Sequence, residues 1–336
     1  MNPLTAIAQA NAGFLLLIAT TITWYIAARA ALDALPPTRA MNPLLRAVAH
    51  WVPIAALALY GIWSNRPEVA VTAVFATSVA ALSLVLGILI LSGAVGEASA
   101  EARRPWGLIA PVAMMTFLAG FKGHFTATHA LIFLIEGAVV AYLMSPQVAR
   151  NGPAAVSGPP REASLRSLQF LLAIAVALLG AWLGAMTTDR MATSAHFLTR
   201  EFVTAAMLSP ALMLPMIGTG SELVHEGRFD TAVSSLVSVV LLNLCLLLPV
   251  MILFSLVVTA RANTTLNVSF QSALLDASPL FVPMTAWRID NVFLIVLGMA
   301  LIPISIGRWA LGRTEGVLVL LVYTFYLALV ARAAVM

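Results

Sequence analysis

The stretch that decides the fold is DTAVSSLVSVVLLNLCLLLP, residues 230–249. It begins with an acid, continues through small and β-branched residues, contains one amide, and ends in pure hydrocarbon. Such a run is typical of a helix that crosses a bilayer, because roughly 20 apolar residues span about 30 Å of hydrocarbon. Its polar residues Ser234, Ser235, Ser238 and Asn243 are an ion site, the remains of one, or contacts between helices.

The whole chain has the composition of a membrane protein. Of its 336 residues, 61% are hydrophobic and 10% are charged, and the mean hydropathy is +0.98. Soluble domains carry about 45–50% apolar and about 25% charged residues. The apolar runs are continuous, whereas a membrane β-barrel needs short strands of alternating polarity. The predicted fold class is therefore an all-α polytopic membrane protein.

We expect about ten transmembrane helices. The apolar runs lie at 12–32, 44–63, 69–93, 106–121, 127–145, 167–187, 202–224, 231–258, 279–306 and 314–335. The first run is interpreted as a retained span and not as a cleaved signal peptide, because it is long and no basic segment precedes it.

The basic residues indicate the orientation of these spans. With the N-terminus outside, the inside loops hold Arg29, Arg39, Arg46, Arg103, Arg104, Arg150, Arg161, Arg166, Arg228, Arg308 and Arg313. An excess of Lys and Arg on the cytoplasmic side is the rule for membrane proteins. The prediction is a bacterial inner (cytoplasmic) membrane protein with both termini outside.

A polar, Pro/Gly-rich stretch, SPQVARNGPAAVSGPPREASLRS at 145–167, divides the chain near its middle. Five expected spans lie on each side of it. An odd number of spans per half makes the two halves enter the membrane in opposite senses, as in the inverted repeats of many secondary transporters. The predicted organisation is a five-helix repeat at 1–145, a polar linker at 146–166 and a second five-helix repeat at 167–336.

The sequence resembles the sodium/calcium exchanger superfamily, the cation/calcium antiporters. That family carries a GTSxPE turn and, fifteen residues after its Pro, an acid that opens DIAVGNxxGSNxxN. Here Pro215 stands fifteen residues before Asp230, which opens DTAV, and Asn243 falls on the last Asn of the motif. The first half has a similar opening in PEVAV, with Pro53 fourteen residues before Pro67. The closing GRTEGVLVLLVYTFYLALV also resembles the last span of the family.

The resemblance implies two inverted five-helix repeats and secondary cation antiport by alternating access. Where the family has its two Pro-Glu acids, this chain has Ile54 and Met216, which cannot ligate calcium. A competing alignment matches GTGSEL, residues 218–223, to the family turn and restores an acid at Glu222, but it needs a deletion before Asp230. We therefore expect a degenerate ion site, with sodium, calcium and protons all open as substrates.

The candidate residues of the ion or substrate pathway are Asn243, Ser234, Ser238, Thr72, Ser78 and Glu222. At helical spacing the two serines share a face and Asn243 lies opposite, so they do not form one seam. Close packing of transmembrane helices is a sufficient explanation of the serines. Glu136 within its span, and His50 near Pro53 where a broken helix is expected, are candidates for proton coupling or for helix contacts.

Other kinds of chemistry have no signature in the chain. Walker, dinucleotide-binding, HExxH and Cys/His metal patterns are absent, and the single Cys245 lies in an apolar run. We expect no enzyme activity, no cofactor and no nucleic-acid partner, and the sequence identifies no metal. The expected partners are the lipid bilayer and, for a transporter, a small cation. The alternative is a non-transporting structural or assembly subunit of a larger membrane complex, with other membrane subunits as partners, and transport of a neutral solute is a third possibility.

Overall fold

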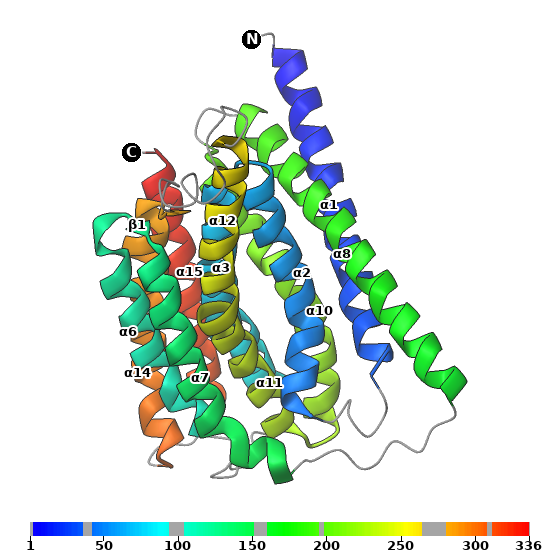
Figure 1. The fold of residues 1–336 in the computed structure, drawn as a ribbon, viewed down its shortest axis with the longest axis vertical. Coiled ribbons are helices and arrows are strands. Elements are labelled where there is room, and N and C mark those ends of the chain that lie inside the picture. The colour runs from blue at the N-terminus through cyan, green and yellow to red at the C-terminus, as the bar shows by residue number, and fades with distance from the viewer. Residues whose placement is uncertain are drawn as a thin grey trace.

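The computed structural model describes residues 3–35, 42–93, 104–150, 160–194, 198–263, 280–307 and 311–335. Within these ranges, ten helical segments are long and apolar enough to cross a membrane. The prediction of about ten transmembrane helices is therefore confirmed. Both termini lie at the same end of the bundle, at the top of Figure 1. This end is called the upper end below, and the opposite end the lower end.

The first half of the chain supplies five spans. Its elements are α1 (Pro3–Asp33), α2 (Pro43–Trp63), α3 (Pro67–Ala80), the π-helical η1 (Ala81–Val85), α4 (Leu86–Ser92), η2 (Arg104–Leu108), α6 (Ile109–Ala119), η3 (Gly120–Lys122), β1 (His124–Phe125) and α7 (Ala127–Arg150). Elements α3, η1 and α4 form one continuous span.

The second half supplies the other five spans. Its elements are α8 (Pro160–Ser194), α9 (Arg200–Val203), the π-helical η4 (Thr204–Leu208), α10 (Ser209–His225), α11 (Phe229–Leu242), the π-helical η5 (Asn243–Leu247), α12 (Leu248–Asn263), β2 (Leu280–Phe281), the π-helical η7 (Ala286–Asp290), α14 (Asn291–Ser305) and α15 (Arg313–Val335). Helix α7 runs to Arg150 and α8 starts at Pro160, so helix covers much of the stretch interpreted as a linker.

One turn occurs twice, at opposite ends of the bundle (Figure 1). At the upper end α2 ends at Trp63, Asn65 follows with a positive φ of 57°, and Arg66 N donates to Gly61 O at 2.7 Å. At the lower end α10 ends at His225, Gly227 follows with φ 75°, and Arg228 N donates to the carbonyl of Leu223 at 2.8 Å. A left-handed residue with this hydrogen bond is a common way to end a helix. The same turn at inverted positions is what two inverted repeats require.

The two halves also share a departure from α-helical geometry. The π-helical segment η1 follows α3, and η5 follows α11 at the equivalent position of the second half. By contrast, α2 and α10 continue without interruption through Pro53 and Pro215. The expectation of a helix broken at Pro53 is therefore wrong. A proline removes one N–H donor, and a helix inside a membrane bundle tolerates that loss when its neighbours support it.

Burial divides the spans into central and peripheral ones. The spans α3–η1–α4 and α11–η5–α12 are the most buried, one from each half, whereas α7 and α15 expose most of their surface to the surrounding medium. In Figure 1, α3 and α12 lie at the centre of the bundle, with α1 and α8 paired along one side. The fully buried Trp24 of α1 packs on Gly180 and Gly184 of α8. Small residues of this kind let transmembrane helices approach closely.

A two-stranded antiparallel sheet of β1 and β2, called the clip below, connects the two halves at the upper end. Strand β1 pairs with β2 in antiparallel register, His124 with Phe281 and Phe125 with Leu280. Val282 N extends the pairing by donating to the carbonyl of Gly123 at 3.0 Å. The clip joins the α6–α7 connection of the first half to the segment that precedes η7 in the second.

Candidate functional site

The two central spans meet at Asn243, the first residue of η5. Its side chain is fully buried, and Nδ2 donates to Ser78 Oγ at 3.0 Å and to Thr77 Oγ1 at 3.3 Å. These two hydroxyls donate in turn to carbonyl oxygens of their own helix, at Ala73 and Val74. The Oδ1 of Asn243 accepts no hydrogen bond from any residue that the structure describes. Asn243, Thr77 and Ser78 are called the central polar cluster below.

The central polar cluster lies deep in the bundle. Ser78 is roughly 16 Å along the span from the start of α3 at Pro67, at 1.5 Å per residue, which is about half the thickness of a bilayer core. Asn243 opens a π-helical segment, where the backbone hydrogen-bonding pattern changes register. Such π-bulges are rare and occur frequently at functional sites. The cluster therefore combines buried side-chain oxygens with a local irregularity of the backbone.

The structure separates the other predicted pathway residues from this cluster. Ser238 donates to the carbonyl of Ser234 in its own helix at 2.8 Å, and it lines an apolar groove between α11 and α7. Thr72 lines a different pocket at the upper end of the bundle. Glu222 is 61% exposed at the lower end and pairs with Arg29 at 3.4 Å. Of the six predicted pathway residues, Asn243 and Ser78 are the pair whose side chains are hydrogen-bonded across the two halves in the described part of the chain.

His50 takes part in a second polar contact between the halves. It is buried, and its Nε2 lies 3.1 Å from the Oγ1 of Thr219. Thr219 also donates to the carbonyl of Pro215, one turn earlier in α10, at 3.0 Å. This arrangement is a helix contact beside the second proline, the role that the sequence left open together with proton coupling.

Glu136 approaches the π-helical segment η5 from the peripheral helix α7. The next residue, Gly137, lies so close to η5 that a Cβ there would be 2.8 Å from the carbonyl oxygen of Cys245. One carboxylate oxygen of Glu136, Oε2, is buried and has no hydrogen-bond partner among the described residues. Glu136 is therefore an acid next to the segment that carries Asn243.

Apolar side chains, those of Ile54 and Met216, occupy the two positions that hold acids in the exchanger motif. Ile54 is 0% exposed and Met216 is 2% exposed, and both belong to the main hydrophobic core. Within the residues that the structure describes, no group of three or more His, Cys, Asp or Glu side chains is placed to hold a metal ion. The oxygens of the central polar cluster itself belong to one amide and two hydroxyls and are uncharged.

Sequence reasoning missed several polar residues that the structure brings together. Thr77 could have been found, because it adjoins Ser78 in the ATSVAA stretch. Thr219 lies in the GTGSEL segment that the competing alignment considered. Asp290 and Glu201, both at the upper end, look in the sequence like ordinary charges at the ends of spans, and nothing local distinguishes them.

Comparison with known proteins gives a fold but no close relative. No protein-family model and no curated protein sequence matches the chain. Among solved structures, the H⁺/Ca²⁺ exchanger CAX aligns with 98% of this chain and 85% of its own, with a TM-score of 0.69 and 14% identity. YfkE aligns with 97% of this chain and 95% of its own, at a TM-score of 0.68 and 14% identity. The sodium-calcium exchanger NCX_Mj aligns with 96% of this chain and 99% of its own, at 0.61 and 12%.

These similarities extend over nearly the whole chain at very low sequence identity. They agree with the family that the motifs around Asp230 and Asn243 resemble. This chain is an all-helical integral membrane protein with the fold of the cation/calcium exchangers.

Proposed function

We propose that this protein is a secondary transporter of a monovalent cation, with sodium as the favoured ion, working by alternating access of its two inverted halves. The observation that carries this proposal is the central polar cluster. It places a fully buried amide of the second half against two hydroxyls of the first half. Transporters of this plan bind their ions near the midplane, between the repeats.

The central polar cluster has oxygens to offer to a cation. Asn243 Oδ1 is buried without a donor among the described residues, and a buried polar atom is costly when it lacks a partner. The hydroxyl oxygens of Thr77 and Ser78 each accept one hydrogen bond from Asn243, and a hydroxyl has two acceptor lone pairs. Three hard oxygen atoms therefore come from facing helices of the two halves.

The charge of the cluster favours sodium over calcium. Calcium sites use six to eight oxygens and usually include carboxylates. Here the two exchanger acid positions hold Ile54 and Met216, and the oxygens of the central polar cluster are uncharged. A single positive charge is easier to bury among neutral oxygens than a double one, because the cost of desolvation rises with charge. Glu136, beside η5, is our candidate for exchanging a proton against that ion.

The orientation follows the basic residues. Helices α1, α7 and α10 end at the lower end, on the side that the sequence assigns to the inside, and both termini lie at the upper end. We place the protein in the inner membrane of a bacterial cell, with its lower end facing the cytoplasm. The central polar cluster is then reached alternately from the two sides.

A second candidate function is a structural or assembly subunit that uses the exchanger fold without transport. The observation in its favour is that the apolar side chains of Ile54 and Met216 belong to the main hydrophobic core, at the positions where the exchanger motif has acids. Polar contacts such as Asn243 with Ser78 also hold helices together without an ion. The two functions differ in one measurable property, the movement of ions.

The test is sodium uptake by purified protein in liposomes under imposed sodium and proton gradients. Asn243→Ala removes the amide and should abolish uptake. The matched control is Asn291→Ala, because Asn291 is also buried and lies 3.1 Å from Thr116 of the other half, outside the central polar cluster. This control should keep uptake.

The outcomes separate the candidates. Uptake that is lost with Asn243→Ala and kept with Asn291→Ala supports the central polar cluster. Equal uptake by Asn243→Ala and the wild type would refute the site. The absence of uptake from wild-type protein shown to be folded would favour the structural subunit, and isolation of its membrane partners would follow.

A further inference from the structure

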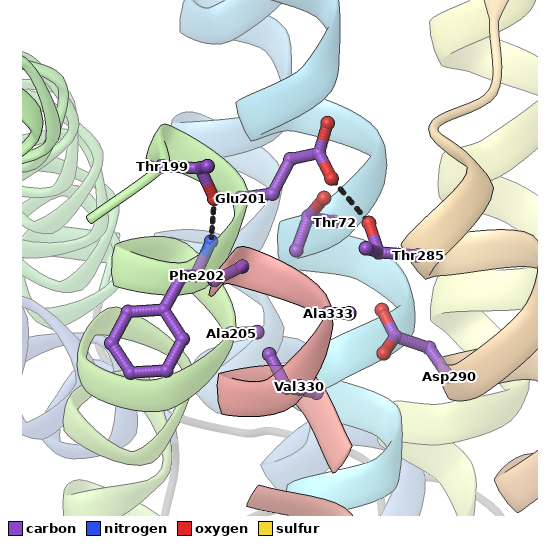
Figure 2. A pocket seen from close by; sticks show the side chains of 10 residues that line it. Thr72, Thr199, Glu201, Phe202, Ala205, Thr285, Asp290, Val330 and Ala333 are labelled. Carbon is purple, nitrogen blue, oxygen red and sulfur yellow. Dashed lines mark hydrogen bonds between the residues drawn. The ribbon is translucent and has the colours of Figure 1, made fainter. Parts of the chain in front are cut away.

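A small pocket with two acids lies at the upper end of the bundle, away from the central polar cluster. Figure 2 shows it between the ends of four spans. The residues that line it are Thr72, Thr199, Glu201, Phe202, Ala205, Thr285, Asp290, Val330, Ala333 and Ala334. They come from α3, from α9 with the residue before it and η4 after it, from the start of the η7–α14 span and from the end of α15. It is called the upper pocket below.

Asp290 is the most unusual group in the upper pocket. Its side chain is 1% exposed, and Oδ1 accepts a hydrogen bond from the hydroxyl of Tyr326 at 3.0 Å. Its other oxygen, Oδ2, is buried and has no hydrogen-bond partner among the described residues. In Figure 2 the carboxylate of Asp290 points from its helix toward the middle of the pocket. A buried carboxylate oxygen is expensive to leave without a partner.

Thr72 faces the same space from α3. It is 1% exposed, and its Oγ1 also has no hydrogen-bond partner within the described part of the chain. Two independent buried oxygens are thus directed into one pocket. Most threonines inside transmembrane helices bond to a carbonyl of their own helix, as Thr77 and Thr204 do here. The geometry of Thr72 is therefore a departure from the local pattern.

Glu201 supplies the second negative charge. Its carboxylate accepts a hydrogen bond from the hydroxyl of Thr285, across the pocket. Among the described residues that line the pocket, none is Lys, Arg or His. The neighbouring Arg200 is engaged elsewhere, with Glu68 at 3.0 Å and Asp189 at 2.8 Å. With both of its acids ionised, the upper pocket carries two negative charges that its own side chains do not neutralise.

We propose that the upper pocket is a binding site for a divalent cation of the calcium class. Two carboxylates and two hydroxyls are hard oxygen ligands of the kind that calcium selects. The pocket has a cavity volume of about 50 Å³. One water molecule needs roughly 10–15 Å³ of such volume, so the pocket has room for an ion together with water. An ion can therefore keep some water ligands and complete its coordination of six to eight oxygens.

This site is separate from the one proposed for transport. Thr72 and Ser78 lie six residues apart on the same span, which is roughly 9 Å at 1.5 Å per residue. The ligands also differ in charge, because the upper pocket has carboxylates and the central polar cluster has none. The divalent site does not depend on the proposed transport, and it is measured as equilibrium binding without any flux.

The test is terbium luminescence of the purified full-length protein in detergent. Tb³⁺ is a hard cation that substitutes for calcium and emits when a nearby excited tyrosine transfers energy to it. Tyr326 is hydrogen-bonded to Asp290 and can serve as that donor. We expect emission that saturates as terbium is added. Calcium should displace the bound terbium and lower this emission, whereas sodium should not. The expected calcium affinity is roughly 10⁻⁴ to 10⁻³ M, the range of sites that face the outside of cells.

The variants are Asp290→Asn and Glu201→Gln, which keep the shape of each side chain and remove its charge. Each should weaken calcium displacement about tenfold or more, because affinity follows the number of charged ligands. Glu226→Gln is the matched control, since Glu226 is an exposed acid at the lower end. It should bind like the wild type.

Two results would overturn the proposal. One is terbium emission from both pocket variants that matches the wild type, and the other is emission that calcium does not displace at millimolar concentrations. If Asp290→Asn does not fold, Glu201→Gln decides alone, because Glu201 is only partly buried and its replacement keeps an acceptor for Thr285.

Discussion

Introducing Glu at the two positions that hold acids in the exchanger motif tests whether these positions still face a common ion site. The change is Ile54→Glu together with Met216→Glu, at the residues that follow Pro53 and Pro215. Both native side chains are buried, at 0% and 2% exposure. The two positions are related by the same interval as the inverted turns at Asn65 and Gly227.

The expected magnitude follows from burial of charge. A charged side chain at the centre of a membrane helix costs roughly 2.5–3.5 kcal/mol on insertion scales, so two acids cost roughly 5–7 kcal/mol. Proteins are stable by only about 5–15 kcal/mol. Without calcium, the double variant should therefore be strongly destabilised or unfolded. A ligand at 100 times its dissociation constant adds about 2.7 kcal/mol of stability.

The assay is thermal unfolding in detergent, with a calcium chelator or with calcium in excess. Calcium should raise the Tm of the double Glu variant by more than it raises the Tm of the wild type, which has the upper pocket but lacks the two added acids. The control is Ile54→Gln with Met216→Gln, which matches the size of the two acids but carries no charge, and its Tm should respond to calcium no more than that of the wild type. A double Glu variant that folds but gains no more stability from calcium than the wild type does would show that the two positions do not face a common site.

Three further changes have definite expected results. Gly298→Ala should lower the free energy of unfolding by about 1–3 kcal/mol, because its Cβ would lie 2.7 Å from the backbone N of Ala110 in α6; thermal unfolding measures this. Glu222→Gln should leave sodium uptake unchanged and stability within about 1 kcal/mol, because its pair with Arg29 is exposed. Glu136→Gln should abolish uptake driven by a proton gradient and retain sodium–sodium exchange in liposomes, because it removes an ionisable group beside η5 while keeping the central polar cluster.

Each of these changes has a result that contradicts its reasoning. For Gly298, the control is Gly218→Ala, whose Cβ would lie 3.7 Å from its nearest neighbour, the hydroxyl of Tyr25. Equal stability of the two alanine variants would refute the close contact between α14 and α6. Loss of sodium uptake with Glu222→Gln would favour the competing alignment. Proton-driven uptake by Glu136→Gln would assign this acid to helix packing.

The spans and the inverted plan could be predicted because their signals are local in the sequence. Apolar runs of about 20 residues mark each span regardless of its neighbours. The spacing from Pro215 to Asp230 and Asn243 aligned the second half with the exchanger motif. That alignment placed Asn243 and Ser78 in one candidate pathway, and the structure brings them within 3.0 Å.

The remaining polar contacts could not be predicted because their partners lie on distant helices. Asp290 neighbours Arg288 in the sequence and looks like an interface anchor, but it is buried against Tyr326 of α15. Thr72 was assigned to the central pathway on its motif position, although it lies about two and a half turns before η1 and faces the upper pocket. Helical periodicity gives the face of one helix but not the neighbour that this face meets.

Glu222 shows the limit of motif matching. The GTGSEL segment resembles the exchanger turn by eye and offers an acid at the right place within the motif. In the structure the residue lies near the end of α10, is 61% exposed and pairs with Arg29. Glu222 is exposed because it lies three residues before the end of α10, and its place in the motif does not change that.

The most direct test of transport through the central polar cluster is sodium–sodium exchange with radioactive sodium in liposomes. Exchange requires only binding and alternating access, so it needs no knowledge of the coupled ion. We expect unlabelled sodium inside the liposomes to accelerate uptake of labelled sodium by the wild type, and we expect no acceleration with Asn243→Ala. Acceleration that persists in folded Asn243→Ala protein, or that is absent from the folded wild type, would contradict the proposed site.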